Sequence, residues 1–112
     1  MNNISFDDFM KVEICVGTIL TAELNNNLNN PAIVLTIDFG KKIGIKKSSA
    51  QLIANYTCDS LIKRQILAVV NFPPRQVGKI ISEVLVLGLS DNNNQPVLIS
   101  PDSNINNGKK LY

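Results

Sequence analysis

The residues best suited to binding chemistry surround a pair of prolines, Pro73 and Pro74. Because proline has no backbone N–H and holds φ at about −65°, it ends the apolar run before it and directs the chain stiffly out of a sheet. Hydrogen-bonding groups on a rigid strand rim, beside a cation that can meet a phosphate, suit a groove for nucleic acid or peptide. A hairpin with a solvated tip is the plainer alternative. The polar residues around the prolines are Asn71, Arg75, Lys79, Ser82 and Glu83.

Catalytic and metal chemistry is not expected. The 112-residue chain has no histidine, and Cys15 and Cys58 are not spaced as CxxC. Ser48 and Ser49 fit a helix cap better than a catalytic pair, and Glu83 is a lone carboxylate in its stretch. We therefore predict that the protein is not an enzyme and holds no metal and no cofactor.

The composition describes one small domain over residues 1–112, without linkers or internal repeats. The 11 Lys and Arg residues against 9 Asp and Glu leave a net charge of +2, so affinity for a polyanion would require local clustering. No secretory signal and no apolar run of roughly 18 residues is present. We expect a cytoplasmic protein without membrane insertion.

The apolar runs on either side of the prolines are predicted strands. Leu67 to Phe72 and Val84 to Leu87 are rich in β-branched residues and lack the helical period. We expect these two strands to be neighbours in the ladder of a closed barrel. Val97 to Ser100 predicts a further short strand, preceded by a loop at Asn92 to Asn94.

A long first strand is predicted from Val12. Ile14 and Val16 share the alternating face of Val12, Cys15 lies on the other face, and Gly17 suggests a bulge or bend. An Asn-rich loop from Asn25 to Asn27 follows.

The second and third strands should form a hairpin. Ala32 to Phe39 alternates cleanly between apolar and less apolar residues, and Gly40 with Lys41 predicts a tight turn into Lys42 to Lys47. Ser48 and Ser49 then precede good helix formers from Ala50 to Tyr56, which predicts one helix after the third strand.

Both ends of the chain carry apolar residues. Ser5 predicts the N-cap of a short helix with one apolar face. Such residues must cover the open end of their own barrel or a partner subunit, and we predict a homodimer. The predicted interface residues are Phe6, Phe9, Met10, Leu111 and Tyr112.

The order of elements predicts an all-β fold. Three strands, a helix and two strands form the five-stranded OB-fold barrel, with one helix between strands three and four and short N- and C-terminal extensions. The pattern alone is also compatible with other small barrels.

Four stretches of the sequence together resemble one family. They are FDDFMKVEICVGTI (Phe6 to Ile19), GIKKSSAQL (Gly44 to Leu52), VVNFPPRQV (Val69 to Val77) and SEVLVLG (Ser82 to Gly88). They are similar to the CsaA family of small export-related chaperones, in the tRNA-binding-domain superfamily. The likeness extends from about Ile4 to Leu111.

This resemblance implies an OB fold, a homodimer built partly from the terminal extensions, binding of tRNA, and capture of unfolded or precursor polypeptides in contact with the protein-export apparatus. The alternative is a stand-alone tRNA-binding protein that resembles the C-terminal domain of methionyl-tRNA synthetase and has no chaperone role. The family usually has Arg where this chain has Cys15, which removes one phosphate contact.

Two sets of candidate ligand-binding residues follow. Phe39, Phe72, Pro73 and Pro74 could line an apolar peptide groove, unless both phenylalanines belong to the core. The RNA candidates lie on the second and third strands and around the prolines, where solvated lysines are the alternative. These RNA candidates are Lys42, Lys46, Lys47, Ser48, Asn71, Arg75, Lys79, Ser82 and Glu83.

Overall fold

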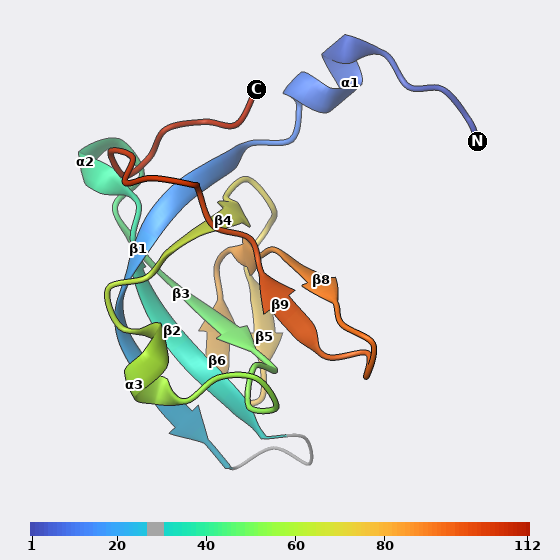
Figure 1. Cartoon of the computed structure of the whole chain (residues 1–112). Coiled ribbons are helices and arrows are strands. Elements are labelled where there is room, and N and C mark those ends of the chain that lie inside the picture. The colour runs from blue at the N-terminus through green and yellow to red at the C-terminus, as the bar shows by residue number, and fades with distance from the viewer. Residues whose placement is uncertain (27–30) are drawn as a thin grey trace.

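The computed structural model describes residues 1–26 and 31–112. Within these residues the main element is a curled antiparallel sheet in the order β3-β2-β1-β4-β7 (Figure 1). The predicted all-β OB fold is therefore confirmed. The strands of the sheet are β1 (Ile14–Asn25), β2 (Ala32–Asp38), β3 (Ile45–Ala50), β4 (Gln65–Val69) and β7 (Leu85–Val86).

The core lies inside the curl of the sheet. Ile33, Leu35 and Ile37 of β2 are fully buried, and Phe39 directly after the strand is buried with them. The alternation predicted for this strand is confirmed, because one face of β2 meets the core and the other does not.

Both faces of the first strand carry buried residues. Cys15 and Ile19 face the core cluster, whereas Val12 lies outside the strand and is exposed. Val16 is also buried, where its backbone pairs with the C-terminal segment. The bulge expected at Gly17 lies instead between Ile19 and Thr21.

Gly17 has a packing role. A Cβ atom at this position would lie 2.7 Å from the Cδ1 atom of Phe39 and 2.7 Å from the Cγ2 atom of Ile37. The absent side chain therefore provides the space into which the Phe39 ring packs.

Gly17→Ala should lower the free energy of unfolding by about 2 kcal/mol, because an extra methyl group in a filled core typically costs about 1 to 3 kcal/mol. Thr21→Ala, an exposed position on the same strand, is the control and should change stability by less than about 0.5 kcal/mol. Urea unfolding measures both. Equal stability of the two variants would show that the core can accept the methyl group.

The predicted hairpin of β2 and β3 is present, but its connection is not a tight turn. It contains the short helix α2 (Gly40–Ile43), whose first residue Gly40 has φ of +88°. The helix predicted over Ala50 to Tyr56 is wrong, since Ser48, Ser49 and Ala50 belong to β3.

The helix between β3 and β4 lies later in the chain, as α3 (Cys58–Leu61). Thr57 is its N-cap and forms a reciprocal capping box with Ser60, while Leu61 enters the core. Ser48 does not cap a helix because its hydroxyl donates a hydrogen bond across the barrel to the carbonyl of Val84.

The predicted pairing of the two strands around the prolines is confirmed. β4 and β7 are antiparallel neighbours, with Ala68 opposite Val86. The first of these strands ends at Val69, three residues before Phe72.

The sheet is closed only in part. One backbone hydrogen bond of 2.8 Å, from the Glu83 N–H to the Lys47 carbonyl, joins the far edge of β3 to the segment before β7. The hydroxyl of Ser48 adds the bond to Val84. The sheet is thus a half-barrel whose open side is bridged, and the closed ladder expected from the sequence is not formed within the described residues.

Two small hairpins extend from the sheet. The first, β5 (Arg75–Val77) with β6 (Ile80–Ser82), was not predicted and occupies the loop after the prolines. The second joins β8 (Gly88–Ser90) to β9 (Pro96–Leu98) through the predicted turn at Asn92 to Asn94. In the other predicted Asn-rich loop, Asn25 ends β1, and Asn27 lies outside the described residues.

The two ends of the chain lie at the same end of the barrel as α2 (Figure 1). The helix α1 (Phe6–Met10) projects away from the sheet, and Ser5 caps it as predicted by accepting a hydrogen bond from the Asp8 N–H. The C-terminal segment pairs with the start of β1 through a bridge between Lys110 and Cys15. No helix among the described residues is long and apolar enough to cross a membrane.

Candidate functional site

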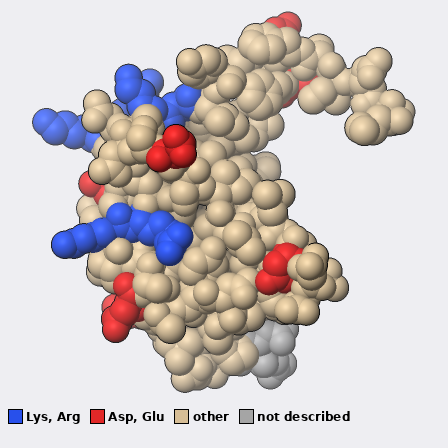
Figure 2. Space-filling model, viewed as in Figure 1, with Lys and Arg blue, Asp and Glu red and all other residues tan. Residues whose placement is uncertain are grey.

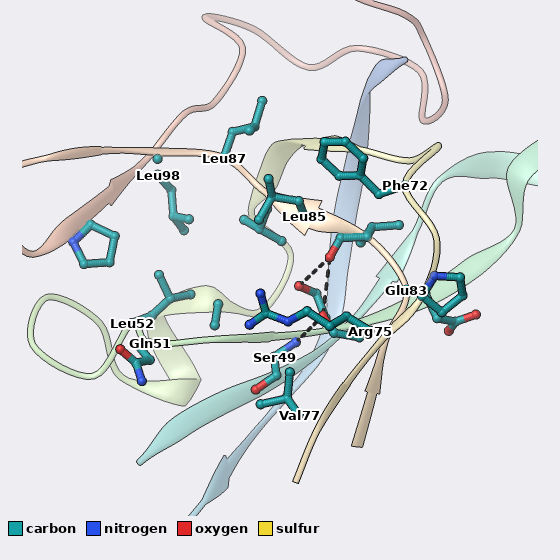
Figure 3. A pocket seen from close by; sticks show the side chains of 18 of the residues that line it. Ser49, Gln51, Leu52, Phe72, Arg75, Val77, Glu83, Leu85, Leu87 and Leu98 are labelled. Carbon is teal, nitrogen blue, oxygen red and sulfur yellow. Dashed lines mark hydrogen bonds between the residues drawn. The ribbon is translucent and has the colours of Figure 1, made fainter. Parts of the chain in front are cut away.

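A groove of about 860 Å³ lies along the bridged side of the half-barrel (Figure 3). Its walls come from the end of β3 and the following turn, the proline segment with β5, the strand β7, and the hairpin of β8 and β9. Phe72 and Leu85, each 50% exposed, present apolar surface to solvent in this groove. The apolar lining residues include Phe72, Pro73, Pro74, Val77, Leu85, Leu87 and Leu98.

Polar groups border this apolar floor. Arg75 points into the groove in Figure 3, and neither a salt bridge nor a hydrogen bond to its side chain is formed within the described residues. The Ser82 hydroxyl accepts a hydrogen bond of 3.1 Å from the backbone N–H of Ser49. The groove therefore combines an apolar floor with one unpaired cation and a rim of small polar groups.

Glu83 has a structural partner on β3. Its Oε1 accepts a hydrogen bond of 3.0 Å from the Lys47 N–H, and its Oε2 lies 3.9 Å from the Nζ of Lys46. These contacts fix Lys46 and Glu83 to one another at the edge of the groove, where both side chains are about one third exposed. An exposed pair of this kind contributes little to stability, so its main effect is to balance the local charge.

Three of the candidate ligand-binding residues have partners within the fold. Phe39 is fully buried in the core and does not line the groove, and Ser48 is buried at the border of the groove with its hydroxyl bonded to the Val84 carbonyl. Asn71 accepts a hydrogen bond of 3.0 Å from the Glu13 N–H and donates one of 2.7 Å to the Lys11 carbonyl. Asn71 thereby ties the chain after β4 to the segment before β1.

The cations predicted to bind RNA do not all line one hollow. Lys47 and Lys79 line a second, smaller hollow of about 430 Å³ together with Glu23. Arg75 lies in the main groove, whereas Lys42 lies on α2 at the far end of the β2–β3 hairpin. The sequence did not predict this separation, and its prediction of a strand from Lys42 to Lys47 is wrong for Lys42, which lies in α2 before β3 begins at Ile45.

Cys15 is buried where the family usually has a cation. Its side chain faces the core, and burial, followed by the charge of Glu13, raises the pKa of the thiol above its ordinary value. Lys110 and Lys42 act in the opposite direction, so both ammonium groups lie in the neighbourhood of this thiol. Cys15 itself offers no surface to a phosphate.

The structure also brings the two chain ends together. The Nζ of Lys110 donates a hydrogen bond of 3.1 Å to the carbonyl of Met10, which links the C-terminal segment to α1. Phe6 is 71% exposed, and its ring centroid lies 6.3 Å from that of Phe9. An apolar surface at the chain ends is therefore present, as expected.

Sequence reasoning missed two features of the candidate site. The β5–β6 hairpin could have been found from Gly78, which has φ of +61° in the turn between two short β-rich runs. The groove residues Leu85, Leu87 and Leu98 lie on predicted strands, but nothing in the local pattern showed that these side chains face a groove.

A family model described as a putative tRNA-binding domain matches residues 14–110. Over nearly the whole chain, the methionine--tRNA ligase of Parabacteroides distasonis is 27% identical over 111 residues. That alignment covers 97% of this chain but only 16% of the length of the ligase.

Two similar solved structures are CsaA proteins. The chaperone CsaA of Bacillus anthracis strain Ames is 42% identical, with a TM-score of 0.92 and coverage of 99% of this chain and 100% of that chain. The CsaA chaperone protein of Picrophilus torridus is 44% identical, with a TM-score of 0.89 and coverage of 98% and 100%. This chain therefore belongs to the tRNA-binding domain family and, within it, to the CsaA family.

Proposed function

We propose that the protein is a chaperone that holds unfolded or precursor polypeptide segments in the apolar groove and also binds tRNA. The observation that carries the chaperone role is the groove itself, an open hollow of about 860 Å³ with an apolar floor. The likeness to proteins described as CsaA chaperones over nearly the whole chain supports the same role. We place this activity in the cytoplasm, in connection with protein export.

The shape and chemistry of the groove favour an extended polypeptide. Its volume lies within the range of about 300 to 1,000 Å³ that is typical of ligand sites. Phe72 and Leu85 offer apolar contacts that do not require one particular side chain in the bound polypeptide. The polar groups of Ser49 and Gln51 at the edge can meet main-chain amides. Apolar contact combined with main-chain hydrogen bonds gives affinity with little sequence preference.

The second candidate function is a stand-alone tRNA-binding protein. Its support is the family model over residues 14–110 and the likeness to one segment of methionine--tRNA ligases. Phosphate contacts and apolar capture differ in their response to salt, because phosphate binding releases condensed counterions and apolar burial does not.

Parallel titrations with total tRNA and with a chemically unfolded polypeptide test the proposal. For roughly four phosphate contacts, a rise from about 50 to about 200 mM salt should weaken tRNA binding roughly 100-fold. Binding of the unfolded polypeptide should change less than about twofold over the same interval. If the protein failed to bind the polypeptide, or if its affinity for the polypeptide fell with salt as steeply as its affinity for tRNA, only the tRNA-binding function would stand.

A further inference from the structure

We propose that the phosphodiester backbone of RNA docks on the end of the barrel formed by α2 and the C-terminal segment. Four lysines meet there, Lys41 and Lys42 from α2 and Lys109 and Lys110 from the C-terminal segment. We call these four residues the basic end. The inference rests on the proposed tRNA binding and specifies the surface that carries it.

Close contact between two backbones forms the basic end. A Cβ atom on Gly40 would lie 2.7 Å from the carbonyl oxygen of Asn107, and one on Gly108 would lie 2.5 Å from that of Phe39. The chain can approach itself so closely only because both positions are glycine, with φ of +88° and +92°. Lys41 and Lys109 each directly follow one of these glycines, so both residues lie next to the contact.

The C-terminal lysines are held in place by the sheet. Val16 donates a backbone hydrogen bond of 3.0 Å to the Lys109 carbonyl and accepts one of 2.7 Å from the Gly108 N–H. Lys110 forms the backbone bridge with Cys15, and the charges of both Lys110 and Lys42 act to lower the pKa of the Cys15 thiol. The two lysine pairs therefore share one region of the surface, although they are far apart in the sequence.

The charge of the basic end is not neutralised by ion pairs. Among residues 1–26 and 31–112, the salt bridges are Lys11 with Asp8 and Lys46 with Glu83, and neither involves the basic end. Figure 2 shows basic side chains gathered at the end of the molecule that carries α2, with an acidic side chain beside them and further acidic side chains on the projecting terminal segment.

Carboxylates are also present at this end of the molecule. Glu13 raises the pKa of the Cys15 thiol, and the Oδ1 of Asp38 accepts a hydrogen bond of 2.8 Å from the Gly40 N–H. Asp7 and Asp8 lie on α1, whose Met10 carbonyl accepts a hydrogen bond from Lys110. None of these carboxylates forms a salt bridge with the basic end within the described residues.

This surface fits an extended polyanion better than a small anion. Lysine ammonium groups are compact charges on flexible stems, which follow a row of phosphates without the fixed geometry of a pocket. The other predicted RNA lysines are less suitable, since Lys46 is paired with Glu83 and Lys47 and Lys79 share their hollow with Glu23. The family match over residues 14–110 includes all of the basic end and favours RNA among polyanions.

The test compares two double variants that remove the same charge. Lys42→Gln with Lys109→Gln alters the basic end at two exposed side chains that make no hydrogen bond within the described residues. Lys63→Gln with Arg64→Gln alters the exposed turn before β4. The affinity for total tRNA is measured at several salt concentrations, and urea unfolding confirms that each variant is folded.

The basic-end variant should flatten the slope of log affinity against log salt by about two units and weaken binding at least tenfold at about 0.1 M salt. The Lys63 and Arg64 variant should keep the wild-type slope. An unchanged slope in the basic-end variant would overturn the inference while tRNA binding by the wild type stands. The inference would also be overturned if the basic-end variant lost binding to anionic phospholipid vesicles but retained tRNA binding. That result would assign the surface to lipid. A wild type that does not bind tRNA would instead refute the proposed tRNA binding, together with this inference.

Discussion

The double variant Phe6→Asp with Phe9→Asp is expected to convert a dimeric protein into a monomer. We propose a homodimer because every residue of α1 is exposed or only partly buried and the neighbouring C-terminal residues Leu111 and Tyr112 are exposed as well. Burial of a large apolar side chain contributes about 1.5 to 3 kcal/mol, so four such side chains can offset the cost of association. A two-fold interface would bury the same surface on both subunits.

Light scattering on the purified protein measures this change. The capping box of Ser5 and Asp8 is retained in the variant, so the two aspartates test the apolar surface rather than the start of the helix. Leu89→Asp on β8, an apolar residue that is 68% exposed, is the control and should leave the dimer intact. A monomeric wild type, or a double variant that remains dimeric, would show that the chain ends cover only their own barrel.

Phe72→Ala with Leu85→Ala should weaken binding of an unfolded polypeptide at least tenfold. Both side chains are half exposed in the groove, and the minority of interface residues whose truncation costs more than about 1 kcal/mol cluster at the apolar centre, where these two lie. Fluorescence anisotropy with a labelled unfolded polypeptide measures the affinity. Because the change removes no charge, tRNA binding should be unaffected.

Leu89→Ala with Val97→Ala is the matched control for the groove. These two exposed residues face each other across β8 and β9 but do not line the groove, so the variant removes apolar surface of a similar kind elsewhere. Polypeptide binding should be unchanged in this control. An equal loss in both double variants would indicate general apolar adsorption rather than capture in the groove.

The parts of the fold that the sequence predicted well are those in which local and tertiary preferences agree. β2 alternates because the core covers only one of its faces, so its period is visible in the residues themselves. Ser5 and Asp8 cap α1 through contacts three residues apart, which a local pattern can specify.

The errors arise where distant segments decide the local structure. Val16 is buried beside Cys15 because the C-terminal segment pairs with the first strand, which no alternation within the strand can show. Ser48 and Ser49 extend β3 instead of capping a helix, since their partners are Val84 and Ser82 across the barrel. Tertiary contacts override helix propensity in such cases.

The candidate site was predictable to a similar degree. Pro73 and Pro74 identified the groove wall, because proline must leave the sheet there. Phe39 was misplaced, as an aromatic residue at a strand end can face either a groove or the core. The basic end depends on the contact of Gly40 with Asn107, which joins two segments that carry no shared sequence pattern.

Amide chemical-shift mapping of the isotope-labelled protein, titrated with an unlabelled unfolded polypeptide, tests capture in the groove most directly. Capture there predicts that the largest shifts occur in residues 49–52, 75–77 and 85–88, which surround the apolar floor. Shifts confined to α2 and the C-terminal segment, or no shifts at saturating polypeptide, would contradict the chaperone role of the groove.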